Sequence, residues 1–331
     1  MQYYFAPMEG LTDAVCRRTH CRFYPGEGQA DRYYLPFVSP TKENALNPRK
    51  QRDLLPENNE GVPAIPQVLC KDAAVFLRFA KDLAAMGYRE VNLNLGCPSG
   101  TVVAKGKGAG MLRDPDALDY FLDQVFSGSP EIKVSVKTRL GLRDPEEFDE
   151  ILAVLDRYPI CELTIHPRTQ KAFYVGPVNL PVFERALAHT HLPVCYNGSL
   201  ATAAGCQAFG AQHPSVKALM LGRGLIANPA LLRQLRGGAP ADRTTMQAYF
   251  TALYEEYARV FDSQKNAVRR MKNFWFYAFA MFAGPEKERF EKQMKRVSEP
   301  WEYTALCNQV FTRLAFSCDA DAAQWERPLG G

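Results

Sequence analysis

The sequence has 331 residues, of which 47% are hydrophobic and 23% are charged, and its formal net charge is +4. This composition is ordinary for a globular protein, and no apolar run is long enough to suggest a membrane span. The first residues lack the basic and apolar regions of a secretion signal, and nine scattered cysteines favour reduced thiols, so we expect a cytoplasmic protein without a disulfide framework.

Short apolar segments bounded by turn residues recur eight times before residue 225, and most are separated by stretches with helical spacing. The segments are 3–6, 33–38, 64–69, 90–95, 133–137, 162–166, 193–196 and 217–221, and the helical stretches include 72–86, 116–126 and 145–155. Strands that alternate with helices over about 230 residues are typical of a (β/α)8 barrel. An open, doubly wound sheet is the alternative.

The segment 236–243 interrupts this alternation with Gly, Pro and Ala and predicts a linker. No convincing strand follows it, whereas helical spacing is found at 246–260, 266–282 and 301–316. We therefore predict an α/β protein with a TIM barrel at 1–238, followed by a small helical domain at 239–331.

The predicted helical domain contains a basic segment. Between Ser263 and Arg296, nine Lys or Arg residues stand against three Glu residues. A basic segment on a slightly acidic body indicates a polyanionic partner. A solvated helix face is the plainer alternative.

A cysteine stands where the fourth predicted strand stops. Residues 90–95 alternate apolar and polar side chains, and Gly96 and Pro98 on either side of Cys97 end the strand. In a parallel barrel this end of a strand is where chemistry is done. A thiol with an unperturbed pKa of about 8.5 is mostly protonated at neutral pH and can act as a general acid. A buried structural cysteine is the alternative.

Residues that end the other predicted strands would converge on the same rim. Pro7 and Met8 follow the first strand, Gln67 lies in the third, Asn94 ends the fourth, Lys137 the fifth, His166 and Arg168 the sixth, Asn197 and Gly198 the seventh, and Gly222 and Arg223 the eighth. Glycines and an arginine after the last two strands suit a phosphate, although either glycine pair alone could be a plain turn. Lys137 could stabilise an anionic reduced flavin; the alternative is a lysine that faces solvent. Together with the phosphate-binding glycines and arginine and with Gln67, Lys137 suits FMN.

Six motifs then match a known family in its own order. The segments Phe5–Asp13, Asn94–Pro98, Val136–Gly141, Leu163–Thr169, Tyr196–Gly198 and Met220–Pro229 closely resemble signatures of the tRNA-dihydrouridine synthases. The resemblance covers residues 5 to about 235. It continues more weakly through Val268–Lys272, which is similar to the helical domain that grips tRNA in that family.

The resemblance implies an FMN-dependent, NAD(P)H-using enzyme that reduces specific uridines in tRNA, with a hydride to C6 from reduced FMN and a proton to C5 from Cys97. NADPH is the reductant that the family implies, since the chain has no dinucleotide fingerprint. FMN would be bound by Pro7, Met8, Gln67, Lys137, His166, Asn197, Gly198, Gly222 and Arg223. The tRNA would be contacted by Asn94, Arg168, Lys105, Arg269, Arg270 and Lys272. A uridine in the flexible D-loop leaves its stack most easily.

Other features qualify this interpretation. The glycine-rich loop Gly100–Met111 could close over the substrate, and Ser199 stands where the family commonly has Asp. Cys16, His20 and Cys21 lack a convincing fourth ligand, so we predict no metal site. Two rivals remain: a flavin barrel that acts on a free pyrimidine, which would have no use for the basic tail, and a barrel that binds RNA without catalysis. We infer no obligate protein partner, and the sequence leaves the target uridine and the oligomeric state open.

Overall fold

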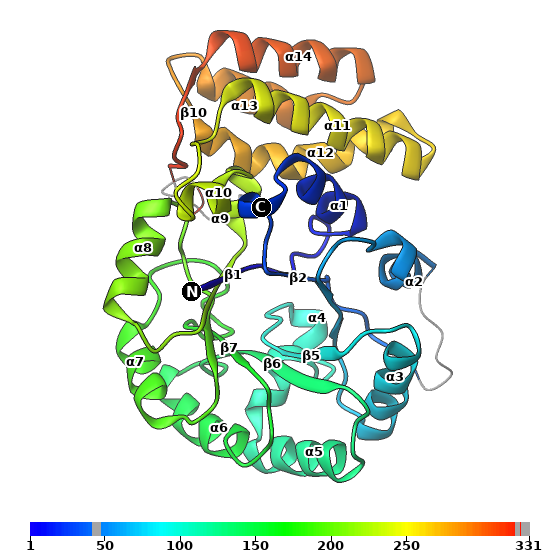
Figure 1. The fold of residues 1–331 in the computed structure, drawn as a ribbon, viewed down its shortest axis with the longest axis vertical. Helices are drawn as coiled ribbons and strands as arrows, with labels where there is room; N and C mark the ends of the chain where they lie inside the picture. Colours follow the sequence, from blue (N-terminus) through cyan, green and yellow to red (C-terminus); the bar gives the residue numbers. More distant parts are fainter. Residues whose placement is uncertain (42–47, 322–324, 326–331) are drawn as a thin grey trace.

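The computed structural model describes residues 1–41, 48–321 and 325. Within these residues, nine parallel strands form one sheet in the order β3-β2-β1-β9-β8-β7-β6-β5-β4. They are β1 (Gln2–Phe5), β2 (Arg32–Tyr34), β3 (Ala64–Ile65), β4 (Gln67–Val68), β5 (Glu90–Leu95), β6 (Lys133–Arg139), β7 (Leu163–His166), β8 (Val194–Tyr196) and β9 (Ala218–Leu221). The sheet curls into a ring with helices outside it (Figure 1). The predicted TIM barrel is therefore confirmed.

The third predicted strand is divided into β3 and β4 at Pro66, which cannot donate a backbone hydrogen bond. Beyond β2, Val38 bridges Val68 in parallel, and the Val38 N–H donates to the carbonyl of Gln67 at 2.9 Å. The chain that follows β2 therefore pairs with β4, and this pairing closes the ring.

Several of the helices around the ring begin at residues whose side chains accept hydrogen bonds from the first turn. Asp72 accepts from the N–H of Val75, and Asp114 from that of Ala117. The helices are α1 (Ala14–Phe23), α2 (Pro48–Leu54), α3 (Ala73–Ala85), α4 (Gly100–Val103), α5 (Pro115–Ser127), α6 (Phe148–Leu155), α7 (Leu180–His189), α8 (Ala203–Gln212), α9 (Arg223–Ala227) and α10 (Leu231–Leu235). None of the helices in the described ranges is both long and apolar enough to cross a membrane.

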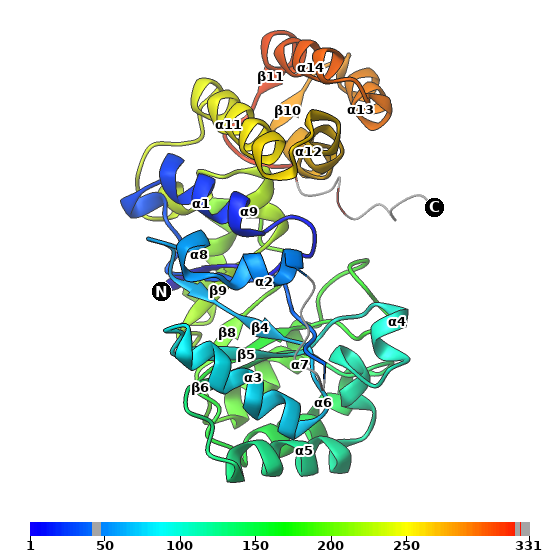
Figure 2. The same cartoon turned by 90° about the vertical axis from the view of Figure 1, so that its right-hand side faces the viewer.

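The C-terminal helices pack against the outer helices on one side of the barrel, where α11 lies beside α1 (Figure 2). They are α11 (Arg243–Phe261), α12 (Gln264–Ala278), α13 (Lys287–Arg296) and α14 (Pro300–Arg313). The expectation that this region contains no strand is wrong, because β10 (Phe282–Ala283) pairs antiparallel with β11 (Ala315–Phe316). The end of the helix predicted at 266–282 is a 3-10 turn followed by β10.

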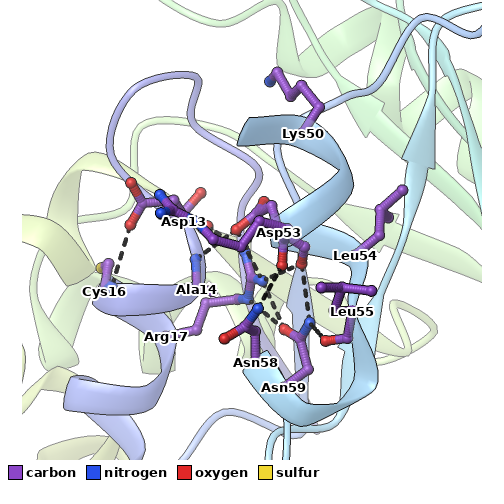
Figure 3. Close-up of polar contacts among 12 residues, drawn as sticks. Asp13, Ala14, Cys16, Arg17, Lys50, Asp53, Leu54, Leu55, Asn58 and Asn59 are labelled. Atoms are coloured by element: carbon purple, nitrogen blue, oxygen red, sulfur yellow. Dashed lines mark hydrogen bonds and ion pairs between the residues drawn. The ribbon is translucent and has the colours of Figure 1, made fainter. Parts of the chain in front are cut away.

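A buried arginine network fixes α1 against the segment that precedes β3 (Figure 3). The guanidinium of Arg17 is fully buried and donates to the Asn59 side chain at 2.6 Å and to the Thr12 carbonyl at 2.7 Å. It also pairs with the carboxylate of Asp53 at 3.3 Å. Because Thr12 belongs to the loop after β1, this network also holds the loop that carries Pro7 and Met8.

Candidate active site

A cavity of about 920 Å³ opens at the carboxyl ends of the barrel strands, which is within the usual size of ligand pockets. Cys97, Asn94, Arg168 and all nine residues expected to bind a cofactor line it. The wall also contains Arg139, Tyr174 and Ser199, and α12 contributes Phe276 and Tyr277. The barrel and the C-terminal helices therefore enclose this space together.

The turn that carries Cys97 is held by Asn94 at the end of β5. The side-chain oxygen of Asn94 accepts from the N–H of Cys97 at 2.9 Å and from that of Gly96 at 3.0 Å. These two bonds satisfy backbone donors that the strand no longer pairs. The thiol is consequently presented at the cavity wall by a fixed backbone.

A chain of buried side-chain amides supports this turn from inside the barrel. The Asn94 amide donates to Gln67 at 2.7 Å, the Gln67 amide donates to Asn92 at 2.8 Å, and the Asn92 amide donates to Ser135 at 2.9 Å. The sequence suggested that Asn94 orients a ligand. Its oxygen is instead used by the Cys97 turn, which leaves one amide hydrogen beyond the bond to Gln67 for a ligand.

The thiol and the lysine that face the cavity have displaced pKa values. Burial raises the pKa of Cys97 above its ordinary value, against smaller lowering effects that include the charges of Arg139 and Lys137. Burial lowers the pKa of Lys137 to about 7, and the charge of Arg139 adds to this lowering. At neutral pH the thiol therefore holds its proton, while Lys137 is poised between its charged and neutral forms.

His166, at the end of β7, is neutral because burial lowers its pKa well below the ordinary value, assisted by the charges of Arg139 and Lys137. Its Nε2 lies 3.1 Å from Nη1 of Arg168. Since arginine can only donate, Nε2 is the acceptor and the ring proton is on Nδ1.

Two guanidinium groups meet at one end of the cavity. Nη2 of Arg168 donates to the hydroxyl of Ser199 at 2.8 Å, and Nη2 of Arg223 donates to the same oxygen at 3.2 Å. Asn197, in the same loop as Ser199, donates to the carbonyl of Met220 at 2.7 Å and joins the loops after β8 and β9. Two arginines beside a hydroxyl suit a phosphate dianion.

Gly198 and Gly222, which follow the last two strands, are glycines for different structural reasons. A Cβ on Gly222 would lie 3.2 Å from the sulfur of Met8, so these two cavity residues are in close approach. A Cβ on Gly198 would overlap the ring and hydroxyl of Tyr196. Glycine at 198 is thus required by the packing of Tyr196, a reason independent of any phosphate.

Three of the four residues expected to contact tRNA from outside the barrel rim lie at the surface, and one does not. Lys105, Arg269 and Lys272 are exposed or half-buried and none of them lines the cavity. Lys272 donates to the carbonyl of Val297 at 2.8 Å. The expectation that Arg270 contacts tRNA has to be corrected, because its side chain is only 8% exposed and pairs with Asp13. It therefore joins α12 to the barrel and is turned away from a partner.

The glycine-rich loop 100–111, which was expected to close over the substrate, is folded. It forms α4 and the 3-10 helix Gly108–Arg113, whose residues 108–112 are buried. The N–H of Ala109 donates to the carbonyl of Cys97 at 3.2 Å. Residues 100–113 therefore pack against the Cys97 turn and support it, and they do not form an open loop over the cavity.

Replacing Gly108 by alanine should therefore disturb the Cys97 turn. Gly108 has φ +56°, and an added Cβ would lie 2.9 Å from Cβ of Cys97. We expect G108A to lower the free energy of unfolding by more than about 1 kcal/mol and to change the alkylation rate of Cys97. Urea unfolding and peptide-resolved labelling measure both. Gly100→Ala, where an added Cβ meets nothing within 4 Å, is the matched control and should neither lower the free energy of unfolding nor change the alkylation rate.

Several residues of the cavity wall were not predicted from the sequence, and two of them could have been predicted. Arg139 follows Lys137 by two residues on β6, so both side chains point to the same face. Ser199 directly follows the Asn197-Gly198 pair. Tyr277 and Phe276 could not have been found, because nothing local to α12 indicates that it reaches the cavity.

Among the described residues, no group of three or more His, Cys, Asp or Glu side chains is arranged to hold a metal ion. In the group of Cys16, His20 and Cys21, both ring nitrogens of His20 have hydrogen-bond partners other than the two cysteines. Nδ1 lies 2.8 Å from the hydroxyl of Tyr33, and Nε2 lies 3.0 Å from the carbonyl of Pro229.

Comparison with known proteins gives a consistent result. A family model described as "Dihydrouridine synthase (Dus)" matches residues 4–316. A tRNA-dihydrouridine(16) synthase of Cupriavidus necator is 27% identical over 314 residues, covering 89% of this chain and 96% of that protein. A protein of the same name from Neisseria meningitidis serogroup B is 27% identical over 259 residues, covering 72% and 73%. Among solved structures, morphinone reductase covers 74% of this chain and 88% of its own, at 14% identity and a TM-score of 0.52, and so shares the fold.

Proposed function

The chain belongs to the dihydrouridine synthase family and reduces uridines in tRNA, and from this premise we propose how its cavity performs the reduction. The observation that carries the proposal is the convergence of Cys97, Lys137 and the Arg168–Arg223 pair on one cavity. An acid, a titratable cation and an anion site are the groups that flavin-dependent reduction of a pyrimidine requires.

The cavity fits FMN by the chemistry of its donors. Arg168, Arg223 and Ser199 would hold the phosphate, assisted by the backbone near Gly198 and Gly222. Gln67 on β4 and Lys137 on β6, which both line the cavity, would contact the flavin ring, and Met8 would pack against it. Pro7, His166 and Asn197 complete the proposed binding set. When bound and reduced, this cofactor supplies the hydride that C6 of the uracil receives.

The affinity for FMN should depend on pH through Lys137. The pKa of Lys137 is lowered to about 7, so in the cofactor-free protein this lysine is charged below pH 7 and loses its charge as the pH rises. We expect FMN binding, followed by flavin fluorescence, to weaken as the pH rises above about 7. Lys137→Met should remove that dependence and leave only the titration of the phosphate itself. Parallel profiles for the two proteins would exclude Lys137 from flavin binding.

Cys97 is the proposed proton donor to C5. Its pKa is raised by burial, so the thiol is protonated when the substrate arrives. A uracil that lies between the flavin ring and this wall would receive the hydride from one face and the thiol proton from the other. Asn94 fixes the thiol through the backbone of the turn, and its remaining amide hydrogen could orient the uracil. Solvent then returns the proton to the thiolate.

The substrate uridine is proposed to lie in the D-loop of tRNA, because the base must leave its stack to enter a cavity of this kind. Curated relatives that are named for position 16 support that nucleotide as the target. Residues 239–331 are proposed as the tRNA-binding domain, with Lys105 contributing from the barrel. The compartment that we propose is the cytoplasm, and NADPH is the proposed reductant.

Neutralising Arg269 should weaken tRNA binding without affecting the barrel. The Arg269 side chain is exposed on α12 and bonds only to the nearby Asn266 side chain, at 3.4 Å, in the described structure. We expect Arg269→Gln to reduce the salt slope of tRNA binding by about 1, as for the loss of one phosphate contact. Filter binding at several salt concentrations measures this slope. An unchanged slope would identify this part of α12 as a solvated face.

A direct assay separates this function from reduction of a free pyrimidine. Purified protein should absorb as a flavoprotein and consume NADPH when unmodified tRNA is added. It should show little turnover with uridine or uridine monophosphate, because these lack the phosphates that the basic helices would contact. Equal turnover of free nucleotide and tRNA would favour the alternative. A colourless protein that binds tRNA would contradict catalysis.

A further inference from the structure

Arg139, the last residue of β6, has no role in the proposed steps, yet it is one of the most buried side chains that line the cavity. It is 1% exposed, and burial lowers its pKa. A desolvated guanidinium is stable in such a place only when its donors are well matched. Its partners therefore indicate what it holds.

The first partner is the peptide that carries Cys97. Nε of Arg139 donates to the carbonyl of Gly96 at 2.8 Å. The N–H at the other end of that peptide, on Cys97, donates to Asn94 at 2.9 Å. The peptide plane between Gly96 and Cys97 is thus bound at both of its polar ends, which fixes the direction in which the thiol leaves the backbone.

The second partner is the loop 169–176, which forms another part of the cavity wall. Nη1 of Arg139 donates to the carbonyls of Thr169 at 2.9 Å and Phe173 at 2.6 Å, and the guanidinium lies 5.1 Å from the ring centre of Tyr174. Phe173 has φ +49°, a backbone conformation that bulky residues rarely adopt. Such strain persists only where surrounding contacts impose it, and the bond to the Phe173 carbonyl is one of them.

We propose that Arg139 is a positioning residue that holds the Cys97 turn and the loop 169–176 in one fixed arrangement, so that the proton donor and this part of the cavity wall are aligned together. This inference rests on the proposed role of Cys97. The planar guanidinium is suited to the task because its nitrogens point in fixed directions, whereas a lysine provides one flexible point of contact.

The test compares Arg139→Gln and Arg139→Lys in the flavin-bound protein. We expect R139Q to retain flavin and to lower kcat for tRNA by about 100-fold, because misplacement by about 1 Å can cost that much. R139K should recover part of kcat, since it keeps the charge and one donor. The alkylation rate of Cys97, resolved by peptide mass spectrometry, should change in both variants. Arg157→Gln is the matched control, because Arg157 is exposed and pairs with Asp119 far from the cavity.

Two results would overturn this role. One is wild-type kcat and Cys97 labelling in R139Q. The other is a loss of activity that merely follows the loss of folded, flavin-bound protein, with kcat per flavin unchanged and no partial rescue in R139K. Failure of the proposed function is distinguishable, because the wild-type protein would then form no dihydrouridine while the Cys97 labelling comparison still reports on positioning.

Discussion

Replacing Cys97 by alanine is expected to lower the rate of uridine reduction by a factor of about 10² to 10⁴, the usual contribution of a general acid, while leaving FMN bound. The structure separates these two effects. The proposed phosphate contacts of the flavin come from Arg168, Arg223 and Ser199, whereas the thiol lies on the turn after β5. Single-turnover reduction of tRNA by prereduced enzyme measures the loss, and the absorption spectrum measures bound flavin.

Cys161→Ala is the matched control, because Cys161 is another half-buried cysteine but precedes β7 at the opposite end of the barrel. It should have wild-type activity. The pH profile adds a second check. Burial raises the pKa of Cys97, so the loss of rate that depends on the thiol should occur above the ordinary thiol range, separate from the change near pH 7 that belongs to Lys137. Full activity in C97A would remove the thiol from the mechanism.

Arg270→Met is expected to destabilise the protein by about 3 kcal/mol, because it removes one member of a buried ion pair with Asp13. Nη1 of Arg270 lies 3.6 Å from Oδ2 of Asp13, and the exposed fractions of the two side chains are 8% for Arg270 and 16% for Asp13. Asp13 also accepts from the hydroxyl of Tyr257 on α11 at 2.7 Å. The pair thus connects the loop after β1 to both α11 and α12. Methionine keeps most of the apolar length of the arginine side chain and removes its charge. Denaturant unfolding of R270M therefore measures mainly the contribution of the charge.

The loss in R270M should diminish as the pH falls toward about 4. Burial raises the pKa of Asp13, and removal of the arginine removes the main opposing influence. A raised acid pKa favours the folded state below the unfolded value and penalises it as the pH rises through the folded value. The neighbouring Arg269→Met is the matched control and should cost little. Equal stability of the two variants, or a loss that grows on acidification, would contradict this account of Arg270.

The barrel could be predicted from the sequence because its signals are local. Alternating strands such as 90–95, and the breaks that end them, give the strand order and the rim directly, so Cys97, Lys137 and Arg223 were correctly expected at one cavity. The split of the third strand was not foreseen, although Pro66 provides the reason. The charged helix α13 was missed because only Phe290 and Met294 of its residues are buried.

What the sequence could not provide is the direction of side chains on the C-terminal helices and the use of polar atoms inside the barrel. Arg269 and Arg270 are adjacent and chemically equal, yet only the packing of α12 on α11 and α9, beside Asp13, decides which one is buried. The hydrogen bonds of Asn94 to the Cys97 turn could not be predicted, because they depend on the fold of residues 94–97. Arg139 was passed over because its partners, Thr169 and Phe173, lie on the next strand's loop.

The most direct test of the account is nucleotide-resolved mass spectrometry of unmodified tRNA after incubation with the purified wild-type protein and NADPH. The account predicts a gain of two hydrogen atoms at a single D-loop uridine, with position 16 as the proposed site, and no such gain with C97A despite its bound flavin. Intact uridines after incubation with a flavin-loaded, folded wild-type protein would contradict it.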